Sequence, residues 1–242
     1  MHSILASRSN PFITGLTTPF RAARLIASTP KLYRLSIAPI ALSILLFIAF
    51  IATILSGIWT MVHAAFLSAI ASYSGLIFVI LSIIAVIGSF MMIGNFLTFF
   101  IALIASPLND LLAEKTEETL EVSEIPHWNT GRFIRIFWID LRKTIVTIFA
   151  GLVFSIGMMI PVANFFFMLG LALLNTFTYI TYPQSRREQG LIQSALWIKN
   201  NFFLSIGFGL TTLALFSIPL VNLIAIPISV VGGTLLYFES KK

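Results

Sequence analysis

Lys31, Tyr33 and Arg34 lie directly after a Thr29-Pro30 pair near the N-terminus of the chain. Threonine at an N-cap and proline at the first helical position are typical of a helix start, because proline there loses no helical hydrogen bond. Free backbone amides and the positive end of the helix dipole favour an anion at such a start. We therefore expect an oxyanion site at these three residues. The alternative is that the cations reach lipid phosphates and fix the orientation of the helix.

A second group of polar residues, including Asn109 and Glu114, follows a long apolar stretch. Pro107 can kink a helix and free backbone carbonyls at the depth where Asn109 would lie. We therefore expect Asn109 and Glu114 to line a polar pathway. The alternative is an ordinary helix that leaves a membrane with a solvated acidic face.

Two later apolar stretches are each interrupted by proline and asparagine, at residues 160–164 and 218–222. These interruptions predict the tips of two helical hairpins. Asn164 and Asn222 at the tips either line the same pathway, bonded to one another or to a permeating solute, or cap their own turns.

Arg186 and Arg187 follow Tyr182 and Pro183, and form a further basic site. They have the same two interpretations as Lys31 and Arg34, namely contact with an anion or contact with lipid phosphate.

Residues for catalysis are scarce. The chain has no cysteine, its three histidines are scattered, and it lacks the metalloprotease, serine hydrolase, P-loop and paired-aspartate motifs. We therefore expect no enzyme, no cofactor and no metal. A lipid-modifying enzyme inside the membrane would need a polar catalytic cluster at depth, which the sequence does not provide. The basic residues lie in short segments, which argues against nucleic-acid binding.

The elements that must position these residues are apolar. Of 242 residues, 58% are hydrophobic and only 10% are charged, whereas about a quarter are charged in soluble domains. Residues 35–106, 144–185 and 200–238 contain no Lys, Arg, Asp or Glu. Because charge at the bilayer centre is costly, these stretches predict chain buried in a lipid bilayer.

The lengths of these stretches predict an all-α integral membrane protein with two long transmembrane helices and two shorter hairpins. Each hairpin arm corresponds to roughly 25 Å of helix against a hydrocarbon core of about 30 Å, so the hairpins are either re-entrant or four short spans. Amphipathic lead-in helices containing Trp138 and Trp197 precede the hairpins and suggest a duplicated unit. We expect one membrane domain, 1–242, divided into an N-terminal interfacial segment 1–30, long helices 31–62 and 73–120, and lead-in helices with hairpins at 127–185 and 186–238.

Each charge-free stretch is expected to return to the side from which it started. Basic residues are concentrated before the first long helix, whereas the turn that follows it has only His63. The positive-inside rule then places both termini in the cytoplasm.

The ordered motifs resemble those of the CysZ-like sulfate permeases, which belong to the wider etoposide-induced-protein family. The resemblance covers about residues 20–234. It implies uptake of sulfate or a related oxyanion across the cell inner membrane for cysteine synthesis, by a homodimer or larger homo-oligomer. The motifs that carry it are Ala105-Ser106-Pro107-Leu108-Asn109-Asp110-Leu111-Leu112-Ala113-Glu114, then Tyr182-Pro183, then Ile218-Pro219-Leu220-Val221-Asn222-Leu223 with Pro227 and Gly233-Thr234.

The sequence departs from the family in the anion segment. The family usually has Pro-Gly-apolar-Arg-Arg, whereas this chain has Pro30-Lys31-Leu32-Tyr33-Arg34. Lys31 replaces a glycine that allows close approach to backbone amides. Thr181 replaces the acidic residue that tends to precede the Tyr-Pro pair. The alternative function, a non-transporting membrane scaffold or assembly protein of the same family, would explain the altered segment.

Overall fold

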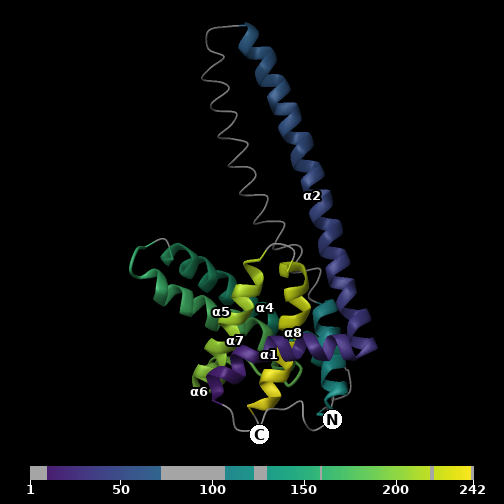
Figure 1. Ribbon diagram of the computed structural model, residues 1–242, viewed down its shortest axis with the longest axis vertical. Helices are drawn as coiled ribbons and strands as arrows, with labels where there is room; N and C mark the ends of the chain where they lie inside the picture. Colours follow the sequence, from purple (N-terminus) through teal and green to yellow (C-terminus); the bar gives the residue numbers. More distant parts are fainter. Residues whose placement is uncertain (1–9, 72–106, 123–129, 159, 219–220, 241–242) are drawn as a thin grey trace. The chain divides into compact units, whose positions relative to one another are not determined.

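The computed structural model describes residues 10–71, 107–122, 130–158, 160–218 and 221–240 (Figure 1). Within these ranges the chain consists of helices joined by turns and contains no strand, which confirms the predicted all-α class. The helices are α1 (Pro11–Ser28), α2 (Pro30–Ala71), a helix over residues 107–119, α4 (Thr130–Gly157), α5 (Asn164–Ser185), α6 (Leu191–Asn200), α7 (Phe202–Phe216) and α8 (Val221–Glu239).

The chain divides into two compact units, the first containing Met1–Ile37 with Asn109–Lys242 and the second containing Ala38–Leu108. All the contacts described below lie within the first unit. The predicted single domain 1–242 stays a prediction.

The helix start at Pro30 is confirmed. The backbone of Thr29 is extended, and its carbonyl accepts a hydrogen bond from the Tyr33 amide at 3.0 Å, as expected of an N-cap residue. α2 continues past the predicted end at residue 62 to Ala71. Of the second predicted long helix, residues 107–119 are helical and 73–106 lie outside the described residues. Among the described residues, α5 alone is long and apolar enough to span a membrane.

The chain turns where proline and asparagine interrupt the apolar stretches. A turn at Ile160–Ala163 joins α4 to α5, and the α7 helix ends at Phe216, before the second interruption. Val162 at the first turn has a positive φ of 71° and is 91% exposed. Such a backbone is unusual for a β-branched residue, so the turn is strained. The depth of these turns in a membrane stays a prediction.

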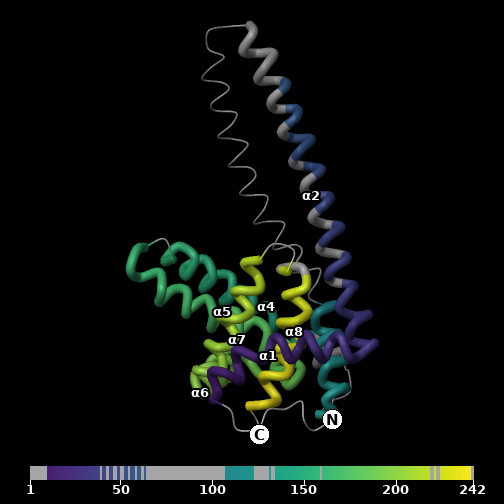
Figure 2. Tube along the Cα trace, viewed as in Figure 1, coloured from purple at the N-terminus to yellow at the C-terminus, as the bar shows by residue number. Residues whose placement is uncertain are grey.

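The two lead-in segments differ from one another, contrary to a simple duplication. The first is continuous with its apolar arm, because α4 is one helix of 28 residues. The second, α6, is separated from α7 by Asn201, whose φ of −116° and ψ of 40° are not helical. Figure 2 traces the Cα path of the chain through α4, α6 and α7.

The N-terminal segment is a helix that packs on the protein. α1 lies across α7 and α8 (Figure 1), with Ala22 and Leu25 on its buried face. Gly15 of α1 faces the Leu204 carbonyl of α7, and Gly207 of α7 faces the Phe12 carbonyl of α1. The two backbones therefore approach closely, as is common where small residues meet between membrane helices.

A second close contact joins α5 to α7. Gly209 lies against the backbone of Ala172, with no room for a methyl group. Two interhelical hydrogen bonds lie nearby in sequence: the Thr176 hydroxyl donates to the Ser205 carbonyl at 2.7 Å, and Asn175 donates to Thr212 at 2.6 Å. Such bonds hold helices together where water is absent.

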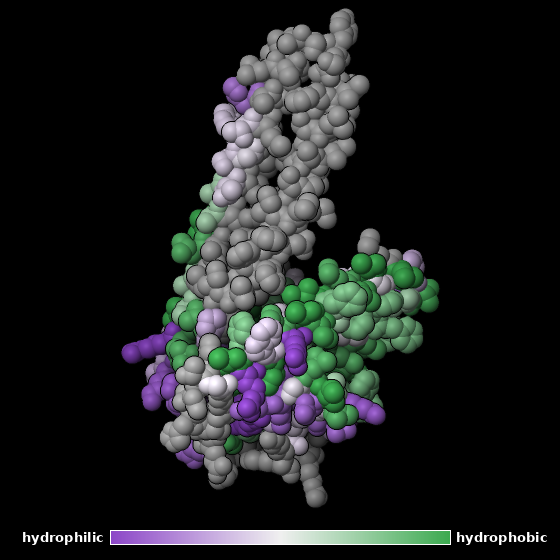
Figure 3. Space-filling view, turned by 180° about the vertical axis from the view of Figure 1, so that it is seen from behind, coloured by the Kyte–Doolittle hydropathy of each residue, from purple (hydrophilic) through white to green (hydrophobic). Residues whose placement is uncertain are grey.

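The surface of the α4–α5 pair is mainly hydrophobic (Figure 3). Apolar side chains there are well exposed, including Phe149 at 70% and Phe166 at 73%. An exposed apolar surface of this extent is what a lipid environment requires.

Candidate functional site

The predicted anion-binding residues lie in the first turns of α2, where all three are exposed; Tyr33 is 56% exposed. Leu32 and Ser36, at 0% and 3% exposure, hold the other face of the same turns against the protein. Within the described part of the chain, no ion pair involves Lys31 or Arg34. The structure therefore places two accessible cations beside a helix N-terminus. Their binding of an anion stays a prediction.

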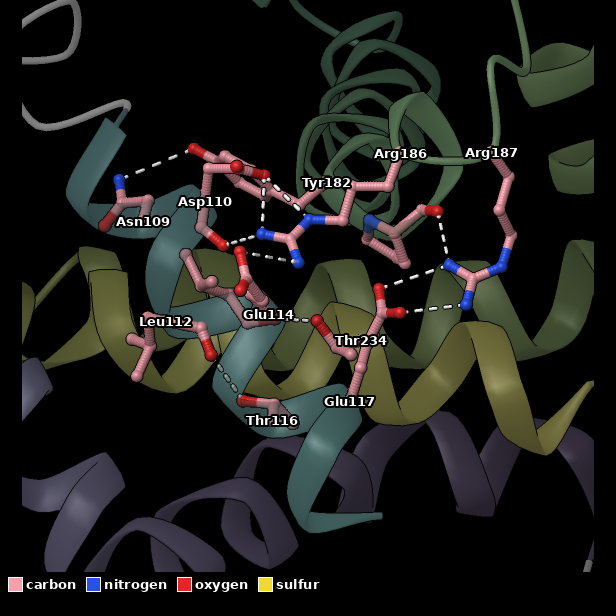
Figure 4. A network of polar contacts seen from close by, with 12 residues as sticks. Asn109, Asp110, Leu112, Glu114, Thr116, Glu117, Tyr182, Arg186, Arg187 and Thr234 are labelled. Carbon is pink, nitrogen blue, oxygen red and sulfur yellow. Dashed lines mark hydrogen bonds and ion pairs between the residues drawn. The ribbon is translucent and has the colours of Figure 1, made fainter. Parts of the chain in front are cut away.

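The predicted pathway residues Asn109 and Glu114 lie on the helix over residues 107–119, which faces the C-terminal end of α5 (Figure 4). Asn109 is 5% exposed, and its amide nitrogen donates to the Tyr182 hydroxyl at 3.4 Å. Its carbonyl oxygen is buried and has no hydrogen-bond partner among the described residues. A buried amide with an unsatisfied carbonyl oxygen is uncommon, so this oxygen retains unused capacity to accept a hydrogen bond.

Arg186 connects this helix to α5. Its Nε donates to Asp110 Oδ1 at 3.0 Å, Nη2 also contacts the Asp110 carbonyl, and Nη1 lies 3.5 Å from Glu114 Oε2 (Figure 4). Burial raises the pKa of the Asp110 carboxyl, and the charge and hydrogen bond of Arg186 oppose this effect. Glu114 therefore shares a cation with Asp110 rather than lining an open surface alone.

Arg187 makes a separate pair with Glu117, which lies about one helical turn after Glu114 on the helix over residues 107–119. Its guanidinium donates to both carboxylate oxygens of Glu117, at 3.2 and 2.8 Å, and to the Pro183 carbonyl at 2.8 Å. Glu117 is 1% exposed, and the guanidinium lies 4.7 Å from the centroid of the Phe238 ring. A bidentate pair of this kind fixes the relative orientation of the guanidinium and the carboxylate and is stronger than a single hydrogen bond. Neither earlier interpretation of Arg186 and Arg187, as ligands of an anion or of lipid phosphate, included these carboxylates.

A buried lysine lies on α4 opposite the same end of α5. Lys143 is 1% exposed, and its Nζ donates to the Ser185 hydroxyl at 3.2 Å. Burial lowers the pKa of Lys143 to about 8, and the charge of Asp140 opposes this effect. Both residues precede the charge-free stretch 144–185, so they lie at its border.

The buried lysine predicts a pH-dependent stability. A folded pKa near 8, below the usual 10.5, means that the folded state binds fewer protons than the unfolded state between these values. Stability should therefore rise with pH through this window, by about 3 kcal/mol. Unfolding in detergent, measured from pH 8 to 10.5, should show this rise in the wild type and not in Lys143→Met. Parallel curves for the two proteins would refute it.

The asparagine of the first hairpin, Asn164, does not join the cluster around Arg186. Asn164 is exposed and is the first residue of α5, whereas Tyr182 lies near the opposite end of this 22-residue helix. Asn222 lies in α8, and its side chain is outside the described residues. The predicted pathway role of both residues therefore stays a prediction, without contact between Asn164 and Asn109.

Sequence reasoning missed Asp110, Glu117, Asp140, Lys143 and Ser185. One signal was available, because Asp110, Lys143 and Arg186 are the charged residues nearest to the borders of the charge-free stretches. Their partners come from distant parts of the chain, and no local pattern identifies them. Within the described residues, no group of three His, Asp or Glu side chains is placed to hold a metal ion.

The sequence profile described as "Sulfate transporter CysZ/Etoposide-induced protein 2.4" matches residues 18–227. Three proteins named sulfate transporter CysZ are similar to the chain. That of Pseudomonas aeruginosa is 25% identical over 175 residues, covering 68% of each chain. That of Pseudomonas syringae pv. tomato is 26% identical over 249 aligned residues, covering 96% of this chain and 94% of the relative. That of Vibrio cholerae serotype O1 is 28% identical over 147 residues, covering 55% and 57%.

Proposed function

The chain belongs to the Sulfate transporter CysZ/Etoposide-induced protein 2.4 family, and on this premise we propose that it is an inner-membrane permease for sulfate or a related oxyanion. Its relatives are named as transporters, which agrees with the absence of catalytic motifs from the sequence. The proposed role is to supply sulfur for cysteine biosynthesis.

The observation that carries the proposal is the placement of charge. Lys31 and Arg34 are exposed beside the start of α2, where backbone amides and the helix dipole also favour an anion. A second set of donors, including Lys143, is buried at the border of a charge-free stretch. In the proposed pathway, α2 captures the anion, and Asn109 and Glu114 line the inner part together with Asn164 and Asn222.

Helix lengths support hairpins that insert only part way. Residues 144–157 of α4 and the 15 residues of α7 each span about 21–23 Å, less than a hydrocarbon core of about 30 Å. The two arms of a hairpin meet at one tip, so the shorter arm limits how deep that tip can lie in the bilayer. The longer helices α5 and α8 would therefore not bring the tips to the opposite face of the membrane. Both termini would then be cytoplasmic, and homodimers or larger assemblies would surround the tips with protein.

The proposal is tested by sulfate uptake into proteoliposomes that contain the purified full-length protein. Arg34→Ala should reduce uptake about tenfold or more, because a charge-assisted hydrogen bond to the anion is lost. Arg24→Ala is the matched control, since Arg24 is an exposed arginine on α1. Both variants should unfold at the same temperature as the wild type.

Two results would contradict this proposal in different ways. Equal uptake by Arg34→Ala and wild type would remove the capture role from α2. Absence of uptake of sulfate and other oxyanions by the wild type would favour the second candidate function, a non-transporting scaffold, which the replacement of the family's glycine by Lys31 also favours.

A further inference from the structure

We propose that Lys143 and Ser185 form a buried oxyanion subsite, and that the neighbouring Asp140 carboxylate competes with the transported anion for the positive charge of this subsite. This inference rests on the proposed function and adds to it a second binding position and a residue that controls access to that position.

The donors of the subsite come from two helices. Lys143 of α4 is 1% exposed and donates to the Ser185 hydroxyl of α5 at 3.2 Å. An ammonium group carries three N–H donors, and Ser185 is the only acceptor found for Lys143 among the described residues. A buried ammonium with one neutral acceptor retains unused capacity to bind an anion.

The competing carboxylate lies one turn earlier on the same helix. Asp140 and Lys143 are three residues apart, so their side chains are neighbours on the α4 surface. The described residues contain no direct ion pair between them; the Ser185 hydroxyl, which accepts from Lys143, also acts on the Asp140 carboxyl and lowers its pKa. A hydroxyl has a single proton. Ser185 can therefore donate to Asp140 or to a bound anion, but not to both.

Buried polar atoms without a hydrogen-bond partner occur on the elements that meet at this end of α5. Asp140 Oδ1 and Asn109 Oδ1 are buried and have no hydrogen-bond partner among the described residues. Gln184, which precedes Ser185, is 0% exposed, and neither atom of its side-chain amide has a partner there. Buried polar groups in folded proteins are nearly always hydrogen-bonded. Three such side chains, on α4, α5 and the helix over residues 107–119, leave unused hydrogen-bonding capacity near the C-terminal end of α5 for a polar guest.

The neighbouring charges leave Lys143 as the cation available to that guest. Asp110 is the nearest other carboxyl that acts on Asp140, and it is paired with Arg186. Tyr182 also faces Asp140, from α5, and is uncharged at neutral pH. α6, which also packs against α4, carries only the exposed Lys199. With Asp140 ionised, the subsite is neutral overall; with Asp140 protonated or displaced, it has a net positive charge.

Protonation of Asp140 therefore opens the subsite. Burial raises the pKa of the Asp140 carboxyl, and Ser185 and the charge of Lys143 oppose this effect. Protonation is thus favoured as pH falls, whereas sulfate stays doubly ionised. Anion binding should strengthen as pH falls, and Asp140→Asn should bind the anion more tightly than a wild type whose Asp140 is ionised.

The first test is stabilisation of the purified full-length protein by sulfate, with sodium chloride at equal ionic strength as the reference. Wild-type protein should be stabilised more at about pH 5.5 than at about pH 7.5. Asp140→Asn should be stabilised more than the wild type at about pH 7.5 and should depend less on pH than the wild type, because only Lys143 of the pair still titrates. Lys143→Met should bind sulfate about tenfold more weakly. Lys199→Met and Glu118→Gln, at exposed positions, should behave as wild type.

The second test is sulfate uptake into proteoliposomes at neutral pH. Asp140→Asn should transport faster than the wild type, a gain that misfolding cannot produce. Unchanged sulfate stabilisation and uptake in both Asp140→Asn and Lys143→Met would overturn the subsite while leaving the permease intact. Stabilisation that follows the predicted pattern without any uptake would keep the subsite and overturn the proposed transport.

Discussion

Replacing Glu117 with glutamine is expected to destabilise the protein by about 3 kcal/mol, because removing one partner of a buried ion pair leaves the other uncompensated. Glu117 is 1% exposed and binds Arg187 with both carboxylate oxygens, at 3.2 and 2.8 Å. The amide would retain the size of the side chain but supply one acceptor instead of two. Chemical unfolding in detergent measures the loss.

Glu118→Gln is the matched control, since Glu118 is the adjacent glutamate and its side chain is 40% exposed in a pair with Lys115. Exposed pairs contribute about 0–1 kcal/mol, so this variant should be nearly as stable as the wild type. A double-mutant cycle with Arg187→Met should return a coupling energy close to the loss in Glu117→Gln. Equal effects of the two glutamine substitutions would contradict the structural role of the buried pair.

Replacing Gly209 with alanine is expected to cost about 3 kcal/mol, because an added Cβ would collide with backbone atoms of Ala172 that cannot rotate away. α5 and α7 would have to separate, which would also stretch the Thr176 to Ser205 hydrogen bond of 2.7 Å. Thermal unfolding of the purified protein measures this effect.

Gly151→Ala separates the clash from the general effect of alanine in a helix. A Cβ at Gly151 would meet Leu174 Cδ2 at 3.6 Å, an ordinary van der Waals contact. Since alanine favours helix over glycine by up to about 1 kcal/mol, this variant should be as stable as the wild type or more stable. If Gly209→Ala were equally well tolerated, the close approach of α5 and α7 would be wrong.

The features that the sequence predicts correctly are those determined by neighbouring residues. Thr29 and Pro30 start a helix through local backbone geometry, and the interruption at residues 160–164 coincides with a turn for the same reason. The all-helical class follows from long apolar stretches, because backbone groups in lipid must be satisfied within a segment.

The polar cluster could not be predicted in the same way. Arg186 and Asp110 are 76 residues apart in the sequence, and Lys143 and Ser185 are 42 apart. Each pairing depends on which helix faces lie together after packing. The sequence predicts that the basic residues at 186 and 187 contact either an anion or lipid phosphate, whereas their carboxylate partners follow only from the fold. In the sequence, Lys143 cannot be distinguished from an ordinary surface lysine, and its burial follows only from the packing of α4 and α5.

The difference between the two lead-in helices has a mechanical consequence. α4 continues without a break from Asp140 and Lys143 to Gly157 beside the first turn, so it acts as one stiff rod. Any tilt of that turn is transmitted directly to the two charged residues at the other end. The second pair of helices has a joint at Asn201, so the direction of α6 does not fix that of α7, which is held instead by its close contacts with α1 and α5. A displacement of the first tip is therefore expected to reach the charged cluster through one helix, whereas no single helix connects the end of α7 to the start of α6.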